Sequence, residues 1–81
     1  KGRLRMKEIL ETIIKNLVED QNAVEINEIA GEQSVVFEVK VADSDMGKII
    51  GKQGRLAKSI RTVIKAVANK EQKRVTVEFI G

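Results

Sequence analysis

A glycine-rich basic segment at residues 47–55 is the feature that most limits how this chain can fold. It holds three glycines and three cationic side chains, with two adjacent isoleucines in its middle. Residues 43–45, Asp-Ser-Asp, are typical of a helix N-terminus, and the apolar spacing after the segment predicts a longer amphipathic helix. Residues 51–54, Gly-Lys-Gln-Gly, are therefore predicted to form a tight, basic turn between two helices.

The chemistry of this turn favours binding of a polyanion over catalysis. Glycines let a foreign backbone come close, because they carry no side chain. Exposed N–H groups at two helix ends favour an anion, and the neighbouring cations add positive charge. We therefore predict that the turn grips a phosphodiester backbone; the alternative, that its glycines only cap the helices, does not explain the clustered cations. The predicted contact residues are Gly47, Lys48, Ile49, Ile50, Gly51, Lys52, Gln53, Gly54, Arg55 and Lys58.

Composition indicates one small globular domain without a catalytic site. The 81 residues are 42% hydrophobic and 33% charged, which is enough for one core. Cysteine and histidine are absent, which removes thiolate metal sites and the commonest general base. No nucleophile–base pair, metal cluster, dinucleotide fingerprint or P-loop can be assembled, so we expect no enzyme activity and no cofactor. No apolar run approaches the roughly 18 residues of a membrane span, and no signal peptide is recognisable, so we expect a cytoplasmic protein without a membrane partner.

Charge is unevenly distributed along the chain. Residues 6–46 carry three cations against ten anions, whereas residues 47–74 carry nine cations against one anion. The formal net charge of +3 equals the contribution of Lys1, Arg3 and Arg5. We interpret residues 1–5 as a cloning remnant or a flexible tail, with a single domain over residues 6–81. The basic half is suited to a polyanion, unless the two halves only attract each other within the fold.

Hydrophobic periodicity predicts the elements of the first half. Apolar residues three and four apart predict a helix from Met6 to about Asp20. Alternation predicts one strand over residues 24–27 and another over residues 35–41, joined by a turn at residues 31–33. Because few residues join them, the two strands should pair as an antiparallel hairpin. Phe37 belongs to the buried face of the second strand.

The second half is predicted to contain two helices and a strand. A short helix over residues 44–50, with Asp43 or Ser44 as its N-cap rather than Asp43 and Asp45 as metal ligands, precedes the turn. The helix from Leu56 to Asn69 follows, and a last strand covers residues 75–79, with Phe79 in the core. The buried stripe of the long helix is predicted to be Leu56, Ile60, Val63, Ile64 and Val67, and the outer cations Arg61, Lys65, Lys70, Lys73 and Arg74 are expected to be solvated.

These elements define an α+β fold of order α-β-β-α-α-β. The second and third strands are linked through helices and can pair in parallel with a right-handed crossover. We therefore predict a three-stranded mixed sheet covered on one face by three helices.

The chain resembles a type II KH domain over essentially all of residues 6–81. The mark of that family is an apolar-apolar-Gly-x-x-Gly turn between two helices, here at residues 49–54, followed by an apolar helix, here with Leu56 and Ile60. The element order matches type II. The small size and residues 45–55 resemble the bacterial small single-KH-domain RNA-binding proteins, the KhpA-like family.

The resemblance implies single-stranded RNA binding through the glycine turn. Gly51 and Gly54 would permit close approach of the sugar-phosphate backbone, while Lys52 and Gln53 would present N–H groups and one cation to phosphate. Ile49 and Ile50 occupy the positions of the groove floor and the core beneath it, in an order that stays open. The resemblance further implies pairing with itself or with a larger KH-containing protein, and an RNA chaperone role linked to cell shape and wall growth.

Two other functions stay open at this point. Two helices joined by a glycine turn resemble a DNA-binding helix-turn-helix, although residues 53–55 offer few side chains for base contacts. The basic segment could instead dock an acidic protein, which would make the chain a protein-interaction module.

Overall fold

The computed structural model describes residues 5–80 of the chain; residues 1–4, within the predicted tail, and residue 81 lie outside the described residues. The elements in chain order are α1 (Met6–Leu17), the 3₁₀ turn η1 (Gln21–Ala23), β1 (Glu25–Ala30), β2 (Ser34–Lys40), α2 (Asp43–Lys70) and β3 (Arg74–Phe79). The first helix is three residues shorter than predicted, and the first strand begins one residue later and continues to Ala30.

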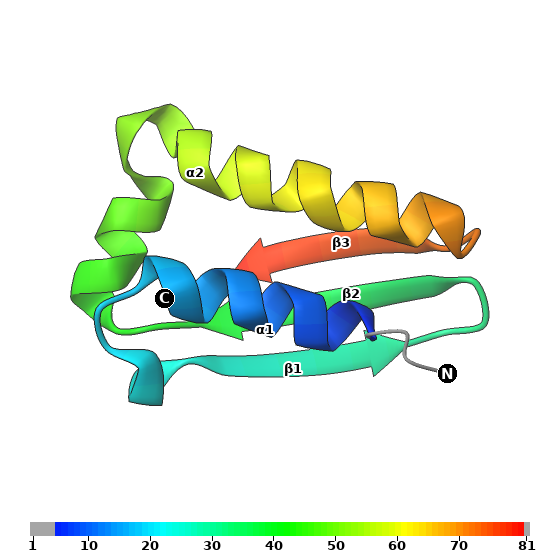
Figure 1. The fold of residues 1–81 in the computed structure, drawn as a ribbon, viewed down its shortest axis with the longest axis horizontal. Helices are drawn as coiled ribbons and strands as arrows, with labels where there is room; N and C mark the ends of the chain where they lie inside the picture. Colours follow the sequence, from blue (N-terminus) through cyan, green and yellow to red (C-terminus); the bar gives the residue numbers. More distant parts are fainter. Residues whose placement is uncertain (1–4, 81) are drawn as a thin grey trace.

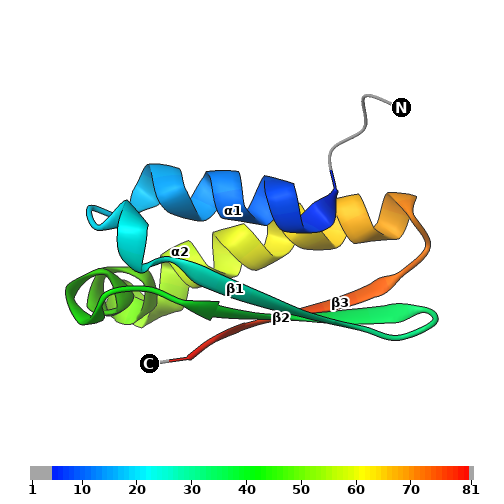
Figure 2. The ribbon, with the colours of Figure 1, turned by 90° about the horizontal axis from the view of Figure 1, so that it is seen from below.

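The sheet has the predicted mixed topology. Its strand order is β1-β2-β3, with β1 antiparallel to β2 and β2 parallel to β3. The hairpin loop is closed by the Gly31 N–H, which donates to the Ser34 carbonyl at 2.7 Å. Both α-helices lie on one face of the sheet, and α2 provides the crossover from β2 to β3 (Figure 2). The other face of the sheet is left uncovered by them.

The core lies between the helices and the inner face of the sheet. On β2 the alternate residues Val35, Phe37 and Val39 are buried, as predicted, and Val77 of β3 lies beside Phe37 in register. Phe79 is half-buried and packs against this core. The buried face of α1 and its end is formed by Met6, Leu10, Ile14 and Val18. Burying each large apolar side chain stabilises the fold by about 1.5–3 kcal/mol, so this layer holds the helices on the sheet.

The prediction that Val63 is buried is wrong. Ile60 and Ile64 are buried as expected, but the Val63 side chain is 47% exposed. Successive residues of an α-helix are about 100° apart, so Val63 lies off the face that Ile60 and Ile64 turn to the sheet. Ala57 and Ala68, which the apolar pattern did not single out, complete that face. Leu56 and Val67 are only half-buried at its margin.

The predicted turn between two helices lies inside α2. The predicted second and third helices form the single element α2, which bends sharply within its length (Figure 1). Residues 51–54 all leave right-handed helical geometry, so α2 consists of two helical segments that meet at a non-helical turn. We call residues 51–54 the elbow, residues 43–50 the N-terminal arm and residues 55–70 the C-terminal arm. The predicted order α-β-β-α-α-β counts these two helical segments separately, whereas the order given above counts α2 once.

Candidate nucleic-acid interface

The elbow has an unusual backbone. Gly51 has φ −61° and ψ 170°, and the next three residues have positive φ: 55° at Lys52, 64° at Gln53 and 68° at Gly54. For a residue with a side chain, the left-handed region costs about 1–2 kcal/mol. The fold therefore holds Lys52 and Gln53 in a strained conformation, and such strain is found preferentially at functional sites.

Only one of the three glycines around the elbow is required by the fold itself. Gly54 has positive φ, which a side chain disfavours. At Gly51 and Gly47, by contrast, φ is not positive and an added Cβ would meet nothing within 4 Å. Gly47 also lies inside the N-terminal arm, where glycine is less favourable than alanine by about 1 kcal/mol. Neither residue is explained by internal packing, and both leave bare backbone open to a ligand.

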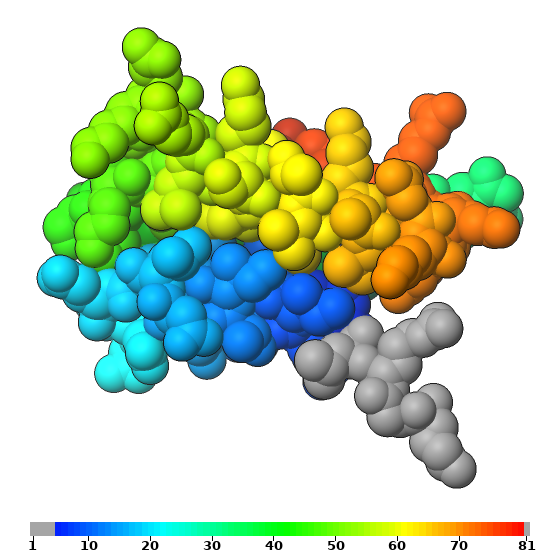
Figure 3. All heavy atoms as spheres, turned by 45° about the horizontal axis from the view of Figure 1, so that its top comes forward, coloured from blue at the N-terminus to red at the C-terminus, as the bar shows by residue number. Residues whose placement is uncertain are grey.

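A hollow of about 520 Å³ lies in the angle between the two arms. It is lined by Gly47, Lys48, Gly51, Lys52, Arg55, Leu56 and Ser59. The elbow stands at one end of the molecule, and side chains of this part of α2 project from the surface (Figure 3). The hollow thus combines bare backbone, three cations and one apolar side chain.

The structure brings five of the ten predicted contact residues together in this hollow and places the other five elsewhere. Ile49 is 1% exposed and belongs to the core, whereas Ile50 is 50% exposed on another side of the N-terminal arm. Gln53 and Gly54 are at the bend, and Lys58 is exposed on the C-terminal arm, but none of the three lines the hollow.

Two lining residues were missed by sequence reasoning. Leu56 was assigned to the buried stripe, and Ser59 was not considered. Residues four apart lie on the same side of a helix. The spacing of Gly47 and Gly51, and of Arg55 and Ser59, could therefore have predicted which side of each helical segment lines the hollow.

The family model for the KhpA/KhpB KH domain matches residues 7–79 of this chain. The chain belongs to this family. A protein of Clostridium acetobutylicum named RNA-binding protein KhpA is 63% identical over 75 residues, which cover 93% of this chain and 100% of the relative. Proteins of the same name from Caldanaerobacter subterraneus and Clostridium perfringens are 60% and 57% identical, with the same coverage. The resemblance inferred from residues 45–55 is thereby confirmed.

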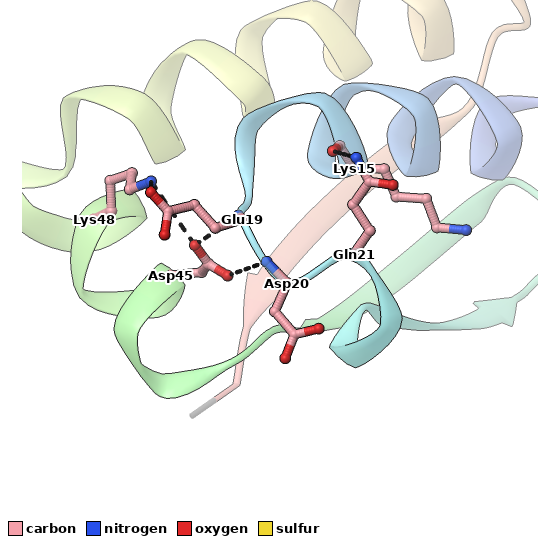
Figure 4. Close-up of polar contacts among 6 residues, drawn as sticks. All are labelled: Lys15, Glu19, Asp20, Gln21, Asp45 and Lys48. Carbon is pink, nitrogen blue, oxygen red and sulfur yellow. Dashed lines mark hydrogen bonds and ion pairs between the residues drawn. The ribbon is translucent and has the colours of Figure 1, made fainter.

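Asp45 is a buried carboxylate at the base of the N-terminal arm of this KH domain. The residue is 2% exposed, and its carboxylate accepts hydrogen bonds from the backbone N–H of Glu19 to Oδ1 at 3.0 Å and of Asp20 to Oδ2 at 3.1 Å (Figure 4). These two hydrogen bonds, with a smaller contribution from the Lys48 charge, hold the pKa of Asp45 below its usual value, although burial opposes them. Asp45 therefore ties the end of α1 to α2.

The predicted N-cap of the second helix is wrong. Ala42 is the N-cap of α2, and no side chain caps this end of the helix. The acidic pattern at residues 43–45 was recognised, but its functional member is Asp45, which bonds to a segment 25 and 26 residues away. Local cap rules cannot anticipate a partner at that separation.

The cations of the C-terminal arm differ in their surroundings. Arg61 donates a hydrogen bond from Nε to the Val77 carbonyl at 3.0 Å, and its guanidinium lies 5.4 Å from the centre of the Phe79 ring. Arg61 is thus held against β3, contrary to the expectation that it is only solvated. Lys65, Lys70, Lys73 and Arg74 are exposed, as expected.

Neither a metal site nor a membrane span is found within residues 5–80. No three acidic, histidine or cysteine side chains of this part gather where they could hold a metal ion. None of the helices described there has the length and apolar character needed to cross a bilayer.

Proposed function

We propose that the elbow of this KH domain binds single-stranded RNA by its sugar-phosphate backbone. The observation that carries the proposal is the combination of bare backbone at Gly47 and Gly51 with three cations around one hollow. Relatives that are 57% to 63% identical are named RNA-binding proteins. Glycines permit the close approach of a ligand backbone, and the cations neutralise phosphate charge.

The proposed contacts follow from exposure and charge. Lys48, Lys52 and Arg55 approach phosphates from the rim of the hollow. The backbone N–H groups of Lys52 and Gln53 at the exposed bend donate to phosphate oxygens. Ile50 is exposed and is the isoleucine available to an RNA base, whereas Ile49 supports the arm from the core. Lys58 adds charge from the next turn of the C-terminal arm.

The affinity of one domain should be modest and should depend on salt. Phe37 is fully buried and Phe79 is half-buried beneath Arg61, so neither provides an open platform on which bases could stack. Recognition then rests mainly on phosphates. A footprint of about two to four phosphates predicts a log–log salt slope of roughly −1.4 to −2.8 for a single strand. Such binding tolerates many sequences, which fits an RNA chaperone.

The competing functions give different results in the same assay. A slope near zero would indicate a protein partner or an apolar ligand rather than RNA. Effective competition by duplex DNA would indicate a helix-turn-helix mode of binding. Single-stranded RNA binding predicts a clear salt slope and weak competition by duplex DNA.

The test is a charge reversal at the bend with a matched control. Replacing both Lys52 and Gln53 by Asp places negative charge where phosphate should lie, and RNA affinity should fall at least about tenfold, or 1.4 kcal/mol. The control replaces Lys73 and Gln72 by Asp, which makes the same change of charge at the far end of α2. Gln72 also has positive φ, 58°, so one of the two control positions shares the backbone strain of the elbow.

Fluorescence anisotropy with a labelled single-stranded RNA pool measures both variants. The control should bind within about twofold of the parent, because it changes only the long-range field. Equal affinities for the two double variants would contradict the assignment of the elbow as the RNA clamp.

We also propose that the domain pairs with a second KH domain, in a homodimer or with a larger KH-containing protein. Support comes from Val63, which is 47% exposed between the half-buried Leu56 and Val67 on one flank of the C-terminal arm. A second domain would raise the affinity for RNA by avidity. Sedimentation of the parent beside Val63→Lys tests the homodimer: the parent should sediment as a dimer and the variant as a monomer.

The proposed RNA chaperone activity and the proposed link to cell shape are tested by separate experiments. We propose that the protein acts on RNA in the bacterial cytoplasm and promotes annealing or strand exchange, which an annealing assay with two complementary RNAs measures. The link to cell shape and wall growth rests on the family resemblance, and the morphology of a deletion strain tests it.

A further inference from the structure

We infer that Asp45 is a positioning residue for the proposed RNA clamp, which it serves by fastening the N-terminal arm of α2 to the end of α1. The inference rests on the proposed function of the elbow. It concerns a residue that does not line the hollow and is not expected to touch RNA.

The fastening is built from two backbone donors and one buried carboxylate. After α1 ends at Leu17, the chain turns so that the N–H groups of Glu19 and Asp20 point at separate oxygens of Asp45. Neither N–H lies within a helix, so the carboxylate provides the partner that regular structure does not. Because each oxygen accepts one bond, both the distance and the orientation of the arm are defined relative to α1 (Figure 4).

The arm that Asp45 fastens forms one side of the hollow and leads into the elbow. Gly47, Lys48 and Gly51 follow Asp45 within two helical turns and line it. Residues 51–54 then lead into the C-terminal arm, which the core holds through Ile60 and Ile64. The angle between the arms therefore depends on how firmly the N-terminal arm is held, and Asp45 is its polar attachment to α1.

Asp45 also helps to orient one cation of the hollow. The Lys48 ammonium lies 3.8 Å from Oδ1 of Asp45 and 3.8 Å from Oε2 of Glu19 (Figure 4). The Lys48 side chain is 48% exposed and remains accessible to phosphate. Glu19 is largely exposed, so the buried Asp45 is the better-defined of the two neighbours.

Electrostatics and positioning predict opposite signs when the charge of Asp45 is removed. Loss of one negative charge near a cationic site should strengthen RNA binding by long-range attraction alone. Loss of the attachment should weaken it. Asp43→Asn is the matched control, since Asp43 is exposed on the same first turn and its side chain takes part in no hydrogen bond recorded for residues 5–80.

The experiment compares Asp45→Ala, Asp45→Asn and Asp43→Asn with the parent, well below the melting temperature of each. Affinity for a labelled single-stranded RNA oligonucleotide is measured by fluorescence anisotropy. Asp45→Ala should bind about fivefold more weakly, or about 1 kcal/mol. Asp45→Asn keeps one acceptor oxygen, and its affinity should lie between those of Asp45→Ala and the parent. Asp43→Asn should bind as tightly as the parent or slightly more tightly.

Amide spectra of the RNA-free proteins provide a second reading. In Asp45→Asn the N–H groups of Glu19 and Asp20 should exchange faster, and the amides of residues 51–54 should shift. Parent-like affinity of both folded Asp45 variants, or unmoved amides at residues 51–54, would overturn the inference and leave Asp45 as a stabilising residue only. If Asp45→Ala does not fold, Asp45→Asn decides. Failure of the proposed function is recognised separately, because the Lys52 and Gln53 double variant would then bind like the parent.

Discussion

Ile49 and Ile50 are neighbours in the chain, yet the Ile49 side chain is 1% exposed and the Ile50 side chain is 50% exposed. The sequence placed both at the groove of a KH domain but left open which one faces outward. The structure divides their roles, with Ile49 in the core beneath the N-terminal arm and Ile50 at the surface beside the elbow. This difference leads directly to a test by paired substitution.

Ile49→Ala should destabilise the domain by about 2–5 kcal/mol, because a buried isoleucine leaves a cavity. Ile50→Ala should cost less than about 0.5 kcal/mol, as is usual for surface positions. If Ile50 contacts a base, Ile50→Ala should also weaken RNA binding while the protein remains folded. Chemical denaturation and RNA anisotropy measure the two effects. A melting transition lowered equally by both substitutions would contradict the assignment of the two side chains.

A second pair tests the buried face of the C-terminal arm. Ile60→Ala should cost about 2–4 kcal/mol, a large share of the stability of so small a domain. Val63→Ala and Lys70→Ala should each cost less than about 0.5 kcal/mol in the monomer, because both side chains are exposed. Denaturation at low protein concentration separates monomer stability from dimer formation. A Val63→Ala cost as large as that of Ile60→Ala would contradict the face described above.

The pattern of successes and failures has a physical explanation. Period-two alternation around Phe37 indicates a strand with one buried face, and helical spacing around Ile60 indicates a helix with one buried face. The structure contains the strand and the helix that these two patterns predicted. Val63 was misassigned because an apolar residue at the margin of a helical stripe is compatible with either burial or exposure. The predicted second and third helices are joined in α2, because the four non-helical residues 51–54 form a tight turn rather than a loop.

The sequence predicted the elbow as the candidate site, but it did not predict the hydrogen bonds that attach the N-terminal arm to the end of α1. Glycines and cations close together in the chain marked the elbow without any tertiary information. Asp45 accepts its hydrogen bonds from Glu19 and Asp20, which are 26 and 25 residues away, and no local pattern identifies such partners. Which face each arm presents to the hollow likewise depends on how α2 packs on the sheet.

Acid should remove the contribution of Asp45 to stability. Its pKa is lowered in the folded state by the N–H groups of Glu19 and Asp20, so folding favours the ionised form. The stabilisation is fully present above the unfolded-state pKa of about 3.9 and is lost as pH falls through the lower folded-state pKa. Thermal melts of the parent and Asp45→Asn should therefore differ most near neutral pH, begin to converge below about pH 4, and converge fully only below the lowered folded-state pKa. A difference that stays constant down to the acid range would contradict a charge-assisted attachment.

The glycines of the elbow and of the N-terminal arm should separate effects on stability from effects on RNA binding. Gly54→Ala should cost about 1–2 kcal/mol of stability, because its positive φ disfavours a side chain. Gly51→Ala should be nearly neutral, and Gly47→Ala should stabilise the helix by about 1 kcal/mol, since an added Cβ meets open space at both positions. If RNA backbone approaches these positions closely, the folded Gly47→Ala and Gly51→Ala proteins should bind RNA more weakly than the parent. Melting curves and anisotropy on the same samples test both statements.

The most direct test of the RNA clamp is an NMR titration of the ¹⁵N-labelled protein with a short single-stranded RNA pool. It should be carried out on the full chain and on a protein beginning at Met6, since Lys1, Arg3 and Arg5 supply the whole formal excess of charge. In both proteins the amides of residues 47–58 should shift most, and deletion of residues 1–5 should weaken binding only modestly by removing screened phosphate contacts. Shifts centred elsewhere, or binding that disappears with residues 1–5, would contradict the account and leave the elbow as a bend without a nucleic-acid role.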